Sequence, residues 1–145
     1  YGGGRAGLMG VVSRAVLSGG GRARGIIPQH LMSREIADTS LTELIEVETM
    51  HQRKAMMIDR ADAFVALPGG LGTLEEISEV LSWAQMGLHR KPVGVLNTDR
   101  FYDPFVRFID HLVTTGFVSA ESRELMRVEA EPAQLLSVLI SATGA

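Results

Sequence analysis

A glycine-rich turn followed by two acids is the part of this chain best suited to chemistry. The turn reads Pro68-Gly69-Gly70-Leu71-Gly72-Thr73 and leads to Glu75 and Glu76. It follows the apolar run 63–67, which is typical of a buried strand, and it precedes a helical pattern that we expect to begin with Thr73 as N-cap. Glycines let backbone N–H groups approach a phosphate, and a helix N-terminus favours negative charge. A phosphate site beside an acid suggests chemistry on a phosphorylated small molecule.

The same residues also allow a plainer interpretation as a capped turn. Thr73-x-x-Glu76 fits a capping box, in which the Thr73 hydroxyl accepts from the Glu76 N–H and the carboxylate reaches back. A cap needs at most one glycine, however, and three precede Thr73. The turn has neither the Gly-Lys-Ser/Thr of a Walker loop nor the G-x-G-x-x-G of a dinucleotide site, so neither kind of site is indicated.

A second set of candidate residues is basic. Arg53 and Lys54 come early in a predicted helix over 50–60, where the helix dipole disfavours positive charge. Solvated surface charge is the simpler explanation for a generic Arg-Lys pair, whereas an anionic ligand would make use of the arginine fork. Glu35 has two interpretations of its own, as a ligand of a ribose hydroxyl or as the ion-pair partner of Arg34.

Short apolar runs alternate with helical patterns along the chain. We expect strands at 25–27, 44–47, 63–67 and 92–97, and helices at 8–18, 50–60, 73–86, 103–115, 119–126 and 131–140. This alternation predicts one α/β domain over 1–145, a Rossmann-like, doubly wound parallel sheet with helices on both faces. Ligands of such folds bind at the carboxyl ends of the strands, where the glycine turn and Met50 would lie. Tyr1-Gly2-Gly3-Gly4 reads like the end of a strand that runs into a turn, so we expect the strand itself to be missing from the start of the chain.

Composition excludes several classes of function. The 145 residues carry a net charge of −3, which gives no basic footprint for nucleic acid. There is no cysteine, the four histidines lack metal-ligand spacing, and no apolar run reaches the ~20 residues of a membrane span. We therefore expect no metal, no membrane contact and, without a signal-peptide pattern, a cytoplasmic location.

Four motifs together carry a resemblance to a known family. They are Tyr1-Gly2-Gly3-Gly4 with Gly7-Leu8-Met9-Gly10, then Met50-His51-Gln52-Arg53-Lys54, then 68–76, and finally Trp83-Ala84-Gln85 with 89–94. In these motifs the chain resembles the LONELY GUY family of cytokinin riboside 5′-monophosphate phosphoribohydrolases. Many relatives carry the older label "lysine decarboxylase-like", but nothing in this sequence indicates a pyridoxal phosphate site.

The resemblance implies an activity and its residues. Family members hydrolyse the N-glycosidic bond of an N6-substituted AMP to free base and ribose 5-phosphate, need no cofactor and form homodimers. They also have a strand and a helix before the Tyr-Gly-Gly-Gly turn, so the resemblance implies that a first strand and helix are missing here. The catalytic pair would be Arg53 and Glu76. The substrate contacts would be Glu35, Arg53, Lys54, Gly69, Gly70, Leu71, Gly72, Thr73, Leu74, Glu75, Glu76 and Ser82, the last of which is usually threonine in the family. Two other functions remain open: a general AMP nucleosidase, and a nucleotide-binding or carrier module without catalysis.

Overall fold

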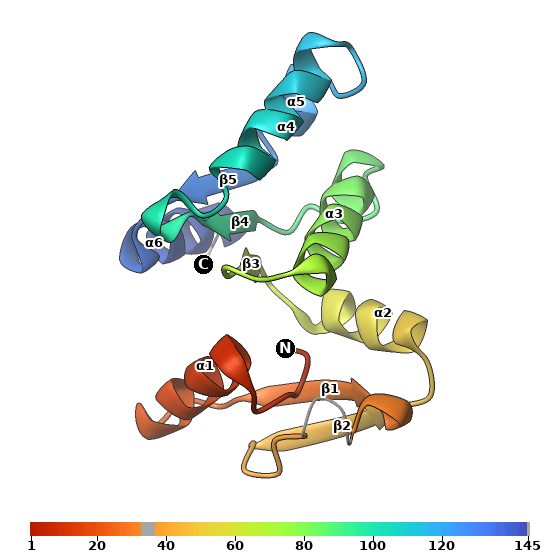
Figure 1. The fold of residues 1–145 in the computed structure, drawn as a ribbon, viewed down its shortest axis with the longest axis vertical. Coiled ribbons are helices and arrows are strands. Elements are labelled where there is room, and N and C mark those ends of the chain that lie inside the picture. Colours follow the sequence, from red (N-terminus) through yellow and green to blue (C-terminus); the bar gives the residue numbers. More distant parts are fainter. Residues whose placement is uncertain (33–36, 145) are drawn as a thin grey trace. The chain divides into compact units, whose positions relative to one another are not determined.

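The fold was analysed in a computed structural model that describes residues 1–32 and 37–144. The chain forms two compact units, Tyr1–Arg60 and Ala61–Ala145, whose elements are labelled in Figure 1. Parallel strands flanked by helices occur in both units, as in a Rossmann-like fold, so the predicted α/β class is confirmed. The expectation of a single domain stays a prediction. No helix in the described ranges is long and apolar enough to cross a membrane.

The first unit contains a two-stranded parallel sheet. Its elements are α1 (Gly7–Ser18), β1 (Arg24–Pro28), the 3-10 turn η1 (Gln29–Leu31), β2 (Glu43–Val47) and α2 (Met50–Arg60). Ile26 of β1 lies opposite Ile45 of β2, and α2 packs against both strands. Tyr1 also runs alongside β1, since its carbonyl accepts from Ile26 N (2.9 Å) and its nitrogen donates to the Arg24 carbonyl (3.0 Å). These bonds give the first residues the strand-like course that the sequence predicts.

The second unit contains a three-stranded parallel sheet in the order β3-β4-β5. Its elements are β3 (Phe64–Ala66), α3 (Leu71–Gln85), β4 (Val93–Leu96), η2 (Thr98–Arg100), α4 (Asp103–Thr114), α5 (Ala120–Arg123), β5 (Met126–Glu129) and α6 (Pro132–Thr143). Helix α6 lies against β4 and β5 (Figure 1). A Cβ added at Gly94 of β4 would come within 2.8 Å of Leu135 and 2.9 Å of Leu139, so the absence of a side chain lets α6 approach the sheet.

The helix predicted over 119–126 is correct at its start and wrong at its end. The helix expected to run from Ser119 to Met126 ends at Arg123, and Met126 instead begins β5, opposite Val93. Ser119 caps this short helix as predicted, since its hydroxyl accepts from Ser122 N at 3.0 Å. Pairing with the buried strand β4 decides the conformation of 126–129, and this interaction is distant in sequence and invisible to a helical pattern.

Candidate functional site

The glycine turn enters α3 earlier than the sequence predicts. Gly70, with φ −95° and ψ −153°, is the N-cap, and the helix begins at Leu71 without a side-chain cap. The predicted N-cap role of Thr73, and with it the capping box to Glu76, is therefore wrong. Thr73 lies in the first helical turn, and its side chain occupies the space that a Cβ on Gly69 would need. A glycine at 69 is thus required by the close approach of Thr73.

The start of α3 presents backbone donors to open space. The N–H groups of Gly70 to Thr73 precede the first helical hydrogen bond, from Leu74 N to the Gly70 carbonyl at 3.1 Å, so the helix itself supplies them no acceptor. Gly70 and Gly72 are exposed, and a Cβ at either position would meet no atom within 4 Å. An anion can therefore approach these donors closely, with the helix dipole in its favour.

Gly69 is bonded on the other side of the turn. Its backbone hydrogen-bonds the phenol oxygen of Tyr102, and the same phenol donates to the Leu67 carbonyl at 2.5 Å. Sequence reasoning missed Tyr102, because it lies 35 residues from Leu67 and belongs to no motif. The donors that remain for a ligand are those of Gly70 to Thr73.

The predicted acids lie within α3. Glu76 is half-buried in the second turn of the helix, Glu75 is exposed, and Leu74 between the turn and the acids is half-buried. Leu71 is 86% exposed at the very start of the helix. Ser82 is exposed and lies about 9 Å further along the helix axis than Glu76, at 1.5 Å per residue. The half-buried Trp83 belongs to the same helix.

Arg53 is a buried cation of the first unit. It is 5% exposed on α2, its Nη2 donates to the Gly2 carbonyl at 3.0 Å, and its Nη1 lies 3.8 Å from the Met50 sulfur. A Cβ on Gly2 would collide with the guanidinium, so the glycine turn at 2–4 makes the room that Arg53 fills. Lys54 beside it is half-buried.

A reciprocal cap fixes the start of α2. The Thr49 hydroxyl accepts from Gln52 N at 3.1 Å, and Gln52 Oε1 accepts from Glu48 N at 2.8 Å. The Thr-x-x-Gln pattern thus provides at α2 the capping that we expected from Thr73 and Glu76 at α3. Because Arg53 follows Gln52 directly, the cap sets the direction in which its side chain leaves the helix.

A buried carboxylate supports the glycine turn at residues 2–4 from another side. Asp38 is 5% exposed, accepts from the Ser13 hydroxyl (2.9 Å) and the Ser40 hydroxyl (2.5 Å), and donates its backbone N–H to the Gly3 carbonyl (2.9 Å). The hydrogen bond from Ser40, more than any other contact, lowers the pKa of Asp38 and keeps it charged. Burial raises the pKa of Tyr1, whose hydroxyl donates to the Gly4 carbonyl at 3.2 Å. Sequence reasoning did not single out Asp38.

Glu35 lies outside the described residues. No group of three or more His, Cys, Asp or Glu in the described ranges could hold a metal ion.

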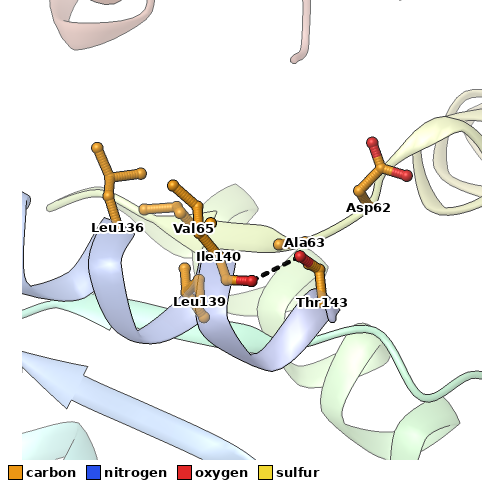
Figure 2. Close-up of a pocket in the computed structure, with 7 residues that line it drawn as sticks. All are labelled: Asp62, Ala63, Val65, Leu136, Leu139, Ile140 and Thr143. Carbon is orange, nitrogen blue, oxygen red and sulfur yellow. Dashed lines mark hydrogen bonds between the residues drawn. The ribbon is translucent and has the colours of Figure 1, made fainter. Parts of the chain in front are cut away.

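An apolar cavity of about 470 Å³ lies in the second unit, and none of the residues that line it is a predicted site residue. Figure 2 shows it between β3 and α6, with Asp62 as its one charged side chain. Its lining consists of Asp62, Ala63, Val65, Leu136, Leu139, Ile140 and Thr143. The Thr143 hydroxyl is already bonded to the Ile140 carbonyl at 2.7 Å. The cavity therefore offers no cation to a phosphate, and the candidate site is the glycine turn.

The fold and the glycine turn define an α/β protein with a glycine-rich loop at the start of a helix. Residues 9–139 match the family model described as "Possible lysine decarboxylase", and the chain belongs to this family. The cytokinin riboside 5′-monophosphate phosphoribohydrolase LOG2 of Arabidopsis thaliana is 54% identical over 139 residues, which are 96% of this chain and 65% of that protein. The corresponding LOG of Oryza sativa subsp. japonica is 55% identical over 126 residues, 87% of this chain and 52% of that protein.

A third relative gives the same result. LOG7 of Arabidopsis thaliana, with the same enzyme name, is 55% identical over 126 residues, 87% of this chain and 58% of that protein. The predicted resemblance to the LONELY GUY family is therefore confirmed. The chain spans between half and two thirds of the length of these relatives.

Proposed function

We propose that this protein hydrolyses the N-glycosidic bond of an N6-substituted adenosine 5′-monophosphate, giving the free base and ribose 5-phosphate. The observation that carries the proposal is the open set of N–H donors at Gly70 to Thr73, with Glu76 one turn further along the same helix. The names of the relatives support the choice of substrate, since each acts on a cytokinin riboside 5′-monophosphate.

Glu76 is the proposed catalytic carboxylate. In the reaction the bond from C1′ to the purine breaks, its electron pair leaves with the base, which takes up a proton, and a deprotonated water oxygen bonds to C1′. The sugar passes through an oxocarbenium-like state, as in glycoside hydrolysis, and a carboxylate near C1′ stabilises that cation and orients the water. The phosphate held by the N–H groups of Gly70 to Thr73 anchors the reacting sugar.

Arg53 is the proposed second catalytic residue. The departing purine gains negative charge, which a guanidinium relieves, and the same group is suited to holding the substrate in place. Its guanidinium has a fixed position, because one nitrogen donates to the Gly2 carbonyl at 3.0 Å. Lys54, Glu35 and Ser82 are proposed as substrate contacts on the strength of the family resemblance, and the same resemblance supports a homodimer.

The test is chromatography of N6-isopentenyl-AMP incubated with the protein, with plain AMP alongside. We expect free prenyladenine from the wild type, and at least a ~100-fold lower rate from Glu76→Gln, which keeps the shape but loses the charge. Glu124→Gln, at an exposed position beside α5, is the matched control and should keep the wild-type rate. A Glu76→Gln variant within a few-fold of wild type would show that the assignment of Glu76 is wrong.

The substrate comparison separates the alternatives. Equal rates on AMP and its prenylated form would identify a general AMP nucleosidase. Binding of either nucleotide without release of the base would identify a carrier module. The acid in the second turn of α3 argues against a carrier, because a module that only holds a phosphate gains nothing from a carboxylate beside it.

A further inference from the structure

One side chain from the loop after β4 holds the glycine turn of the same unit. Tyr102, the residue before α4, is 2% exposed, and its hydroxyl donates to the Leu67 carbonyl at 2.5 Å. The backbone of Gly69 hydrogen-bonds the same oxygen. A single phenol therefore hydrogen-bonds the turn on both sides of Pro68, and Pro68 itself has no backbone N–H to donate.

The phenol is itself fixed from the neighbouring strands. Tyr102 N donates to Asn97 Oδ1 at 2.7 Å, and the Asn97 backbone N–H donates to the Glu129 carbonyl of β5 at 2.8 Å. The ring of Phe101 packs edge-on against the Tyr102 ring, with centroids 4.9 Å apart and planes at 89°. The position of the hydroxyl is thus set by the sheet and not by a freely turning side chain.

The turn that delivers Tyr102 is strained. Asp99 and Arg100 both have left-handed backbone angles, with φ of 52° and 62°, which residues with a side chain adopt rarely and at a cost. Asp103 holds the turn in this form, because it accepts from Asn97 Nδ2 (2.9 Å) and from Arg100 Nε (2.7 Å). The hydrogen bond from Asn97, and then that from Arg100, lowers the pKa of Asp103, so it stays an acceptor at neutral pH.

We propose that Tyr102 is a positioning residue of the phosphate loop, whose phenol turns the Leu67 carbonyl and the Gly69 N–H inward and so aims the N–H groups of Gly70 to Thr73 at the phosphate. The inference rests on the proposed function only for the ligand, a nucleoside 5′-monophosphate. Burial raises the pKa of Tyr102, so the phenol keeps the proton that it donates to Leu67 throughout the neutral range.

The kinetic test is Tyr102→Phe, which removes the hydroxyl and keeps the ring. We expect KM for the nucleotide to rise about tenfold with kcat within a few-fold, because the loop holds the phosphate equally in the ground state and the transition state. A role in stability alone would lower the yield and the melting temperature and leave KM unchanged. Thr98→Val is the matched control, since it removes a hydrogen bond of the same turn, to the Ala130 carbonyl at 3.1 Å, without touching Tyr102.

Binding of ribose 5-phosphate, measured by calorimetry, separates this inference from the proposed function. If the wild type releases no base, the function fails, yet positioning by Tyr102 still predicts about tenfold weaker binding by Tyr102→Phe than by wild type. Equal affinities overturn the positioning role, and a wild type that does not bind ribose 5-phosphate overturns both proposals.

Amide hydrogen exchange on the wild type makes the inference testable even if Tyr102→Phe does not fold. The Gly69 amide should exchange slowly without ligand, because it is bonded to a buried phenol. The amides of Gly70 to Thr73 should exchange quickly and become protected when ribose 5-phosphate is added. A Gly69 amide that exchanges as fast as that of Gly70 contradicts the positioning role.

Discussion

Gly2 and Arg53 form a pair in which the absence of one side chain makes room for the other. The guanidinium occupies the space of a Cβ on Gly2 and bonds the carbonyl of the same residue at 3.0 Å. Sequence reasoning identified both residues through the motifs that contain them, but it assigned the glycine to a turn and the arginine to a ligand. The structure adds that each explains the other.

A methyl group at position 2 should therefore act on Arg53. We expect Gly2→Ala to displace the guanidinium and to lower kcat/KM by about 100-fold, because a misplacement near 1 Å in a reacting group has an effect of this size. The measurement is steady-state kinetics on N6-isopentenyl-AMP. Gly19→Ala is the control, since a Cβ there meets only ordinary contacts at 3.4 Å. Similar rates for both variants would contradict the dependence of Arg53 on Gly2.

Asp38 predicts a dependence of stability on pH. Its pKa is lower in the folded protein than in the unfolded chain, so its contribution is complete above the unfolded value near 4 and disappears as pH falls through the folded value. Asp38→Asn should unfold with about 1–3 kcal/mol less free energy than wild type at pH 7, because serine hydroxyls lose a charged acceptor. Urea unfolding at pH 7 and at pH 3 measures both, and the difference should shrink at pH 3. A difference that is equal at both pH values would show that the charge of Asp38 contributes nothing.

At the scale of elements, the sequence predicts correctly those helices whose signals are local, and it fails where a contact distant in sequence decides the structure. The predicted helix 50–60 has the bounds of α2, because its cap and its apolar spacing lie within the segment itself. The predicted start of the helix 73–86 and the predicted end of the helix 119–126 are wrong, and each depends on atoms far away: Gly70 follows a turn held by Tyr102, and Met126 pairs with Val93. Patterns within about ten residues carry no information on such contacts.

In the turn between β4 and α4 we expect a substitution by glycine to stabilise the protein, whereas such a substitution usually destabilises a folded protein. Asp99 is exposed with φ 52°, so Asp99→Gly should stabilise the protein by about 0.5–1 kcal/mol by removing left-handed strain. Ser137→Gly, at an exposed position within α6, should destabilise it by about 0.5–1 kcal/mol. Thermal unfolding of the two variants measures this contrast. If Asp99→Gly lowers the melting temperature as Ser137→Gly does, the turn stores no strain.

At the scale of the whole molecule, the parallel strands explain why residues distant in sequence meet. Within a parallel sheet the carboxyl ends of the strands share one edge, so the loops that leave them are neighbours. In the second unit the loops after β3 and β4 meet through Leu67 and Tyr102. In the first unit the glycine turn at residues 2–4 contacts Arg53, which lies on the helix after β2. The sequence predicts which loops share an edge, but the particular contacts depend on side-chain packing that no motif records.

The position of Trp83 has a practical consequence. It is the single tryptophan of the chain, and it lies on the helix that also bears Glu76 and begins with the glycine turn. Its intrinsic emission, excited selectively over the two tyrosines, therefore reports from that helix alone. A nucleotide that settles on the first turn of α3 should alter the intensity or wavelength of this emission, so that unlabelled protein carries its own optical signal for ligand titration.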